Sequence, residues 1–119
     1  SSKKSILAER ALQKDHDWAA PLLWRSEFCN VLAVYMRKKI LNLAQTQQIM
    51  DSALKLLSGR EYAVPPHEAL RLAAKSNCSA YDCEFIATAN DLKVHLITVD
   101  KQLLREFPAV AISLDSYSE

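Results

Sequence analysis

The segment VHLITV, residues 94–99, constrains the fold more than any other part of the chain. It is almost continuously apolar and rich in β-branched residues, which is typical of a strand buried on both faces of a sheet. Such strands occur in parallel sheets, whose neighbouring strands are joined by crossover connections. Apolar residues recur at helical spacing on the N-terminal side of the segment, which fits such connections. The sequence therefore predicts an α/β domain.

Strands and helices are expected to alternate along the chain. Asn42 and Ser79 suit helix N-caps. Pro21 suits a first helical turn, and Gly59 suits a helix end. The expected strands cover residues 18–20, 61–64, 94–99 and 110–114, and the expected helices cover residues 3–14, 21–39, 43–58, 67–75, 80–92 and 101–106.

Length and charge indicate one domain with almost no net charge. The 119 residues are half apolar, which suffices for one buried core and is too little for two ordinary domains. The formal net charge of +1 creates no overall field that attracts nucleic acid or membranes. The sequence shows neither a membrane-spanning apolar run nor a signal-peptide pattern. We therefore expect a cytoplasmic protein that does not enter the membrane.

Cysteine, histidine and glycine exclude several kinds of site. Cys29, Cys78 and Cys83 are odd in number and lack CxxC spacing, so reduced thiols are expected rather than disulfides or a zinc ribbon. The three histidines form no HxxxH pair, and no Ser or Cys triad is indicated. Gly59 is the only glycine, which excludes the glycine-rich loops that hold phosphates or dinucleotides.

Two aspartates occupy places where carboxylates often act. Asp100 directly follows the best strand, and functional groups gather beyond the carboxyl ends of parallel strands. Thr98 lies on the same strand face as Asp100, so its hydroxyl could support Asp100 or a water molecule. Asp82 lies in the first turn of a helix, where an anion is favourable. Helix capping alone is the alternative explanation for both aspartates.

Glu27 differs because it lies within an otherwise apolar helical stretch. A carboxylate near a core is costly unless it is paired or bound to metal. Asn30 follows three residues later and is its neighbour on the helix surface. An ion pair with Arg25 or another surface cation is the alternative explanation. If Glu27, Asp82 and Asp100 meet at one sheet edge, they form the oxygen-rich, mutually repelling cluster that Mg²⁺ or Mn²⁺ stabilises.

Three segments, WAAPLLWRSEFCNVL, SAYDCEFIATAND and LITVD, resemble in this order the PIN-domain family and its VapC-type toxins. The T-x-D strand end follows Asp82 by 18 residues. The resemblance implies a three-layer α/β/α sandwich with a central parallel sheet, and Mg²⁺- or Mn²⁺-dependent endoribonuclease activity. It also implies that Glu27, Asp82 and Asp100 bind the metal, that Thr98 orders water, and that Asn30 supports the ligands.

The same resemblance implies three kinds of partner: an RNA substrate, an antitoxin protein and a second copy of the chain in a homodimer. RNA contact would use some of the cations Arg25, Arg37, Lys38, Lys39 and Lys93.

The chain departs from the family at its start. The family opens with a strand that ends in an Asp, and we expect residues 1–119 to be one PIN-like domain without that strand. Weak metal binding and little cleavage follow from this expectation. The alternative is a noncatalytic or truncated module that binds a partner protein or RNA. A phosphoacceptor receiver domain also uses strand-end acids, but the sequence lacks its arrangement of acceptor Asp and distant Lys.

Overall fold

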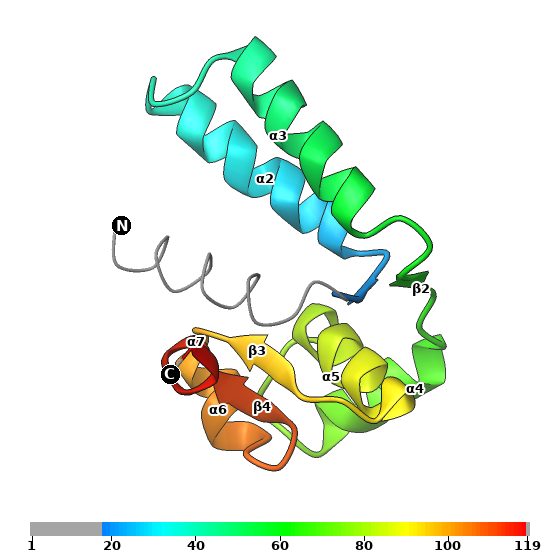
Figure 1. Cartoon of the computed structure of the whole chain (residues 1–119). Coiled ribbons are helices and arrows are strands. Elements are labelled where there is room, and N and C mark those ends of the chain that lie inside the picture. The colour runs from blue at the N-terminus through cyan, green and yellow to red at the C-terminus, as the bar shows by residue number, and fades with distance from the viewer. Residues whose placement is uncertain (1–17, 119) are drawn as a thin grey trace. The chain divides into compact units, whose positions relative to one another are not determined.

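The computed structural model describes residues 18–118, which belong to two compact units. The first to appear along the chain is Trp18–Ala63, and the second contains residues 64–118. Each is described by itself (Figure 1). The helix expected at residues 3–14 lies outside the described residues. The prediction of one domain over residues 1–119 stays a prediction.

The unit Trp18–Ala63 is a helical hairpin with a short parallel strand pair at its base. The helices are α2 (Trp24–Arg37) and α3 (Leu43–Leu56), which lie side by side in Figure 1. The strands are β1 (Ala20–Pro21) and β2 (Glu61–Tyr62), with Ala20 opposite Glu61.

Local chemistry sets both ends of the turn between α2 and α3. Lys39 adopts a left-handed conformation with φ 61°, and the Ile40 N–H donates to the Tyr35 carbonyl at 3.0 Å, which closes α2. The Asn42 side chain accepts from the Gln45 N–H, and the Gln45 side chain accepts from the Asn42 N–H, both at 2.8 Å. This capping box begins α3 where the sequence predicted an Asn42 cap.

The unit that contains residues 64–118 combines helices with a second parallel strand pair. Its helices are α4 (Pro66–Ala74), α5 (Ala80–Leu92), α6 (Lys101–Glu106) and α7 (Leu114–Ser118), and its strands are β3 (Leu96–Thr98) and β4 (Ala111–Ser113). Leu96 lies opposite Ala111, and Thr98 lies opposite Ser113. Because α6 connects β3 to β4, these elements form a β–α–β crossover.

The core of this unit lies beneath α5 and α6. Ile86 and Cys83 of α5 are fully buried, and Leu72 of α4 and Leu103 of α6 join them in one cluster. Burial raises the pKa of the Cys83 thiol, which therefore remains protonated and inert at neutral pH. Cys29 is exposed, and Cys78 and Cys83 are buried.

The predicted α/β class is confirmed, but each of the four expected strands is shorter than predicted. The apolar run at residues 94–99 was expected to be buried on both faces, whereas β3 covers only Leu96–Thr98 and is half-buried. Val94, His95 and Val99 are exposed because they lie beyond the three paired residues of the ladder. Between Trp18 and Ser118, no helix combines the length and apolarity needed to cross a membrane.

Candidate metal centre

Asp82 and Asp100 both lie at helix starts in the unit that contains residues 64–118. Asp82 is in the first turn of α5, where its N–H donates to the Ser79 hydroxyl at 3.0 Å. Asp100 is the N-cap of α6, and its Oδ1 accepts from the backbone N–H groups of Gln102 at 2.8 Å and Leu103 at 3.2 Å. Asp100 therefore does cap α6, whereas Ser79 and not Asp82 supplies the cap of α5. Capping uses only one carboxylate oxygen of Asp100, so it does not exclude a second role.

Thr98 braces the backbone of Asp100. The Asp100 N–H donates to Thr98 Oγ1 at 3.0 Å. The two side chains belong to the same strand end, as their spacing predicted, and the contact reaches the backbone of Asp100 rather than its carboxylate. Because Thr98 accepts in this bond, its own O–H proton can still be donated to a water molecule or a ligand.

The charge of Asp100 affects the ionisation of Asp82. Partial burial raises the pKa of Asp82, and the negative charge of Asp100 raises it further, while an interaction with the Ser79 side chain acts in the opposite direction. A divalent cation between the two would relieve this repulsion, and carboxylate oxygens are the ligands that Mg²⁺ and Mn²⁺ prefer. The donor chemistry of this pair fits such an ion. In the described part of this unit, no third acid, His or Cys joins them in a metal-binding group.

Glu27 and Asn30 lie on α2, in the other unit, and both are exposed. The prediction that Glu27 lies near a core is therefore wrong, and the cost of burying a carboxylate gives no argument for a bound cation there. Their assignment to the metal centre stays a prediction.

Arg25, proposed as the alternative partner of Glu27, forms its ion pair with Glu61 instead. Arg25 Nη2 lies 2.6 Å from Glu61 Oε1, and Arg25 Nε donates to Oε2 at 2.7 Å. The Trp24 indole N–H also donates to Glu61 Oε2, at 2.6 Å. The hydrogen bond from Arg25 is the main reason that the pKa of Glu61 is lowered. This bidentate pair fixes α2 to β2.

A set of hydrogen bonds around Asn77 was not predicted from the sequence. Gln102 Nε2 donates to the Asn77 carbonyl at 2.8 Å, and the Asn77 N–H donates to Glu106 Oε1 at 3.0 Å. These bonds join residues 25 and 29 positions apart, so no local spacing in the sequence signals them.

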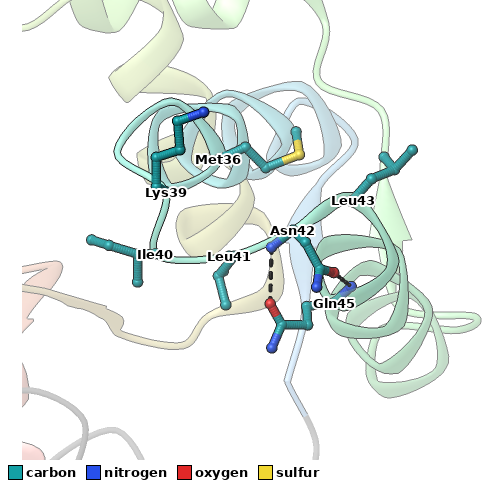
Figure 2. A pocket seen from close by; sticks show the side chains of 7 residues that line it. All are labelled: Met36, Lys39, Ile40, Leu41, Asn42, Leu43 and Gln45. Carbon is teal, nitrogen blue, oxygen red and sulfur yellow. Dashed lines mark hydrogen bonds between the residues drawn. The ribbon is translucent and has the colours of Figure 1, made fainter.

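A hollow of about 430 Å³ lies at the turn between α2 and α3 (Figure 2). It contains none of the predicted metal ligands and no carboxylate, so its chemistry does not suit a cation. Its lining is Met36, Lys39, Ile40, Leu41, Asn42, Leu43 and Gln45.

Comparison with known proteins places the chain in a family. The family model described as PIN domain matches residues 1–110, so the chain belongs to the PIN-domain family. Within that family, the chain is similar to ribonuclease VapC3 of Pyrobaculum aerophilum. The two are 28% identical over 111 residues, which cover 91% of this chain and 85% of that protein. The resemblance predicted from the sequence is confirmed.

The raised pKa of Asp82 predicts the effect of neutralising it. The folded protein binds this proton more tightly than the unfolded chain does, so stability falls as the pH rises through the folded-state pKa. Asp82→Asn removes this penalty. In metal-free thermal unfolding at neutral pH, we expect Asp82→Asn to be more stable by roughly 0.5 kcal/mol, the scale of a partly exposed charge interaction. At a pH below the ordinary pKa of aspartate the gain should vanish, and a less stable variant at neutral pH would contradict the raised pKa of Asp82.

Proposed function

We propose that this protein is an Mg²⁺- or Mn²⁺-dependent endoribonuclease of the toxin–antitoxin type, which hydrolyses phosphodiester bonds in RNA. The observation that carries the proposal is the pair Asp82 and Asp100, two carboxylates at the starts of α5 and α6. Their like charges repel each other. The similarity to a protein named as a ribonuclease supports the same reaction class.

Each side chain has its own role in the proposed hydrolysis. Asp82 and Asp100 would hold the ion through carboxylate oxygens, with Glu27 as a third ligand and Asn30 supporting it. The ion supplies Lewis acidity and a positive charge toward the phosphate that is cleaved. Thr98 can donate its O–H to a water molecule beside Asp100 and so orient that water for attack on phosphorus. No histidine or cysteine is needed in this scheme.

Metal removal tests the proposal directly. We expect the protein to cleave an internally labelled RNA in Mn²⁺ or Mg²⁺ and to lose this cleavage in EDTA, because carboxylates alone cannot neutralise charge on the phosphate. Added Mn²⁺ in excess of EDTA should restore cleavage. Protein expressed from the complete natural reading frame is the sample to use, with the Asp100→Asn variant purified in parallel to detect contaminating nucleases. Cleavage that persists in EDTA would contradict the proposal.

The second candidate function is a noncatalytic module that binds RNA or a partner protein. In its favour, the described part of the unit that contains residues 64–118 assembles only two acids. The cations Arg37, Lys38 and Lys39, exposed at the end of α2, offer contacts for phosphate or carboxylate groups. Mobility-shift assays in Mn²⁺ distinguish the two functions, because RNA binding without cleavage supports the module and cleavage supports the enzyme.

We also propose an antitoxin protein as a partner and a homodimer as the assembly, on the strength of the VapC-type resemblance. Light scattering after size-exclusion chromatography measures the assembly, and a monomer at all concentrations would contradict the dimer. Co-expression with the product of the neighbouring gene tests the antitoxin, and failure of the two proteins to co-purify would contradict that partner.

A further inference from the structure

Gln102 connects the starts of the two helices that carry Asp82 and Asp100. Its backbone N–H donates to Asp100 Oδ1 at 2.8 Å, and its side-chain Nε2 donates to the Asn77 carbonyl at 2.8 Å. One turn further along α6, Glu106 Oε1 accepts from the Asn77 N–H at 3.0 Å. Both backbone hydrogen-bonding groups of Asn77 are therefore held by side chains of α6.

Asn77 belongs to the turn that leads into α5. Ser79, two residues later, caps α5 and accepts the Asp82 N–H. The turn is itself braced by Ser76, whose hydroxyl donates to the Leu72 carbonyl at 2.9 Å and accepts from the Cys78 N–H at 3.3 Å. Hydrogen bonds thus run from the Asp100 carboxylate through Gln102 to Asn77, in the turn that leads into the helix that carries Asp82.

The acids themselves provide no attraction that would hold them together. Asp100 is exposed, and like charges on two carboxylates do not attract each other. The buried core anchors α5 and α6 through Ile86 and Leu103. Hydrophobic contacts are non-directional, however, and do not by themselves fix the spacing of side chains at the helix starts. Hydrogen bonds such as those to Asn77 are directional and can fix this spacing.

We propose that Gln102 and Glu106 are positioning residues that set the spacing of Asp82 and Asp100 for a divalent ion. They act through Asn77 and do not touch the ion, so the inference rests on the proposed metal site. Residues that orient metal ligands in this way change affinity for the ion when they are removed.

The test compares side chains that keep or lose each bond. Gln102→Leu removes the donor to Asn77, and Gln47→Leu makes the same chemical change at an exposed residue of α3. Glu106→Ala removes the acceptor of the Asn77 N–H, whereas Glu106→Gln keeps an oxygen acceptor and removes only the charge. Mn²⁺ affinity by calorimetry and the thermal unfolding midpoint are measured for every variant.

Gln102→Leu and Glu106→Ala should each bind Mn²⁺ roughly 10-fold more weakly than the unaltered protein, the lower end of the effect known for residues that orient metal ligands. Gln47→Leu and Glu106→Gln should bind it nearly as tightly as the unaltered protein. Unchanged affinity in Gln102→Leu and Glu106→Ala would overturn the proposal. The proposal would also be overturned if the losses of Mn²⁺ affinity only followed the decrease in the unfolding midpoint, and if Glu106→Gln bound Mn²⁺ as weakly as Glu106→Ala.

Amide hydrogen exchange in metal-free protein separates this inference from the proposed function. The Asn77 amide should exchange faster in Glu106→Ala and stay protected in Glu106→Gln, whether or not metal binds. Unchanged exchange in Glu106→Ala would contradict the contact itself. If exchange behaves as expected but the unaltered protein binds no Mn²⁺, the metal site is wrong, and the positioning role is overturned with it.

Discussion

Asp100→Asn should abolish measurable Mn²⁺ binding and slow RNA cleavage by roughly 1,000-fold, since the ion supplies several kcal/mol of charge stabilisation to the reaction. The substitution exchanges a charged oxygen ligand for a neutral amide. It leaves the fold intact, because Asn is as good an N-cap as Asp and can still accept the N–H groups of Gln102 and Leu103. Calorimetry with Mn²⁺ and cleavage of labelled RNA measure the two effects.

Two comparisons isolate the role of the carboxylate. Asp91→Asn makes the same change at an exposed aspartate in the last turn of α5 and should leave binding and cleavage unchanged. Asp100→Ala should lose metal binding and also about 1 kcal/mol of stability through the missing cap. If Asp100→Asn binds Mn²⁺ and cleaves RNA like the unaltered protein, Asp100 has only its capping role.

Helix-cap residues and the β-branched run predicted the elements that position Asp82 and Asp100. Ser79 caps α5 and Asp100 caps α6 as expected, because a cap depends on residues within one helical turn. The β-branched run gave the correct strand, and its parallel pairing with β4 fits the α/β class. The predicted burial of residues 94–99 was wrong. Burial depends on how many residues pair in the ladder between β3 and β4, and not on the composition of one segment.

Contacts between distant parts of the chain were not predictable in the same way. Glu27 was interpreted as a carboxylate near a core because its neighbours are apolar, yet it is exposed on α2. The sequence offered Arg25 as its partner, whereas Arg25 pairs with Glu61, which lies 36 residues away. A sequence pattern indicates which residues share a helix face. It does not indicate which element that face meets.

Ile86→Ala should lower the free energy of unfolding by about 2–5 kcal/mol, the range for truncating a fully buried aliphatic side chain. Ile86 has no exposed surface and lies in the cluster that also contains Leu72, Cys83 and Leu103. Removing three carbon atoms there leaves a cavity that the surrounding helices only partly fill. Equilibrium unfolding in urea measures the loss, with Ile86→Val as the smaller step at about 0.5–1.5 kcal/mol.

Ile86→Ala also tests how strongly the spacing of Asp82 and Asp100 depends on the core of this unit. Ile86 follows Asp82 by one helical turn on α5, and Leu103, whose N–H bonds to Asp100, belongs to the same cluster. A cavity between these helices should therefore weaken Mn²⁺ binding in the molecules that remain folded, in addition to reducing their number. Mn²⁺ titration well below the unfolding midpoint separates the two effects. An unchanged affinity there, together with a large loss of stability, would show that hydrogen bonds alone maintain the spacing of Asp82 and Asp100.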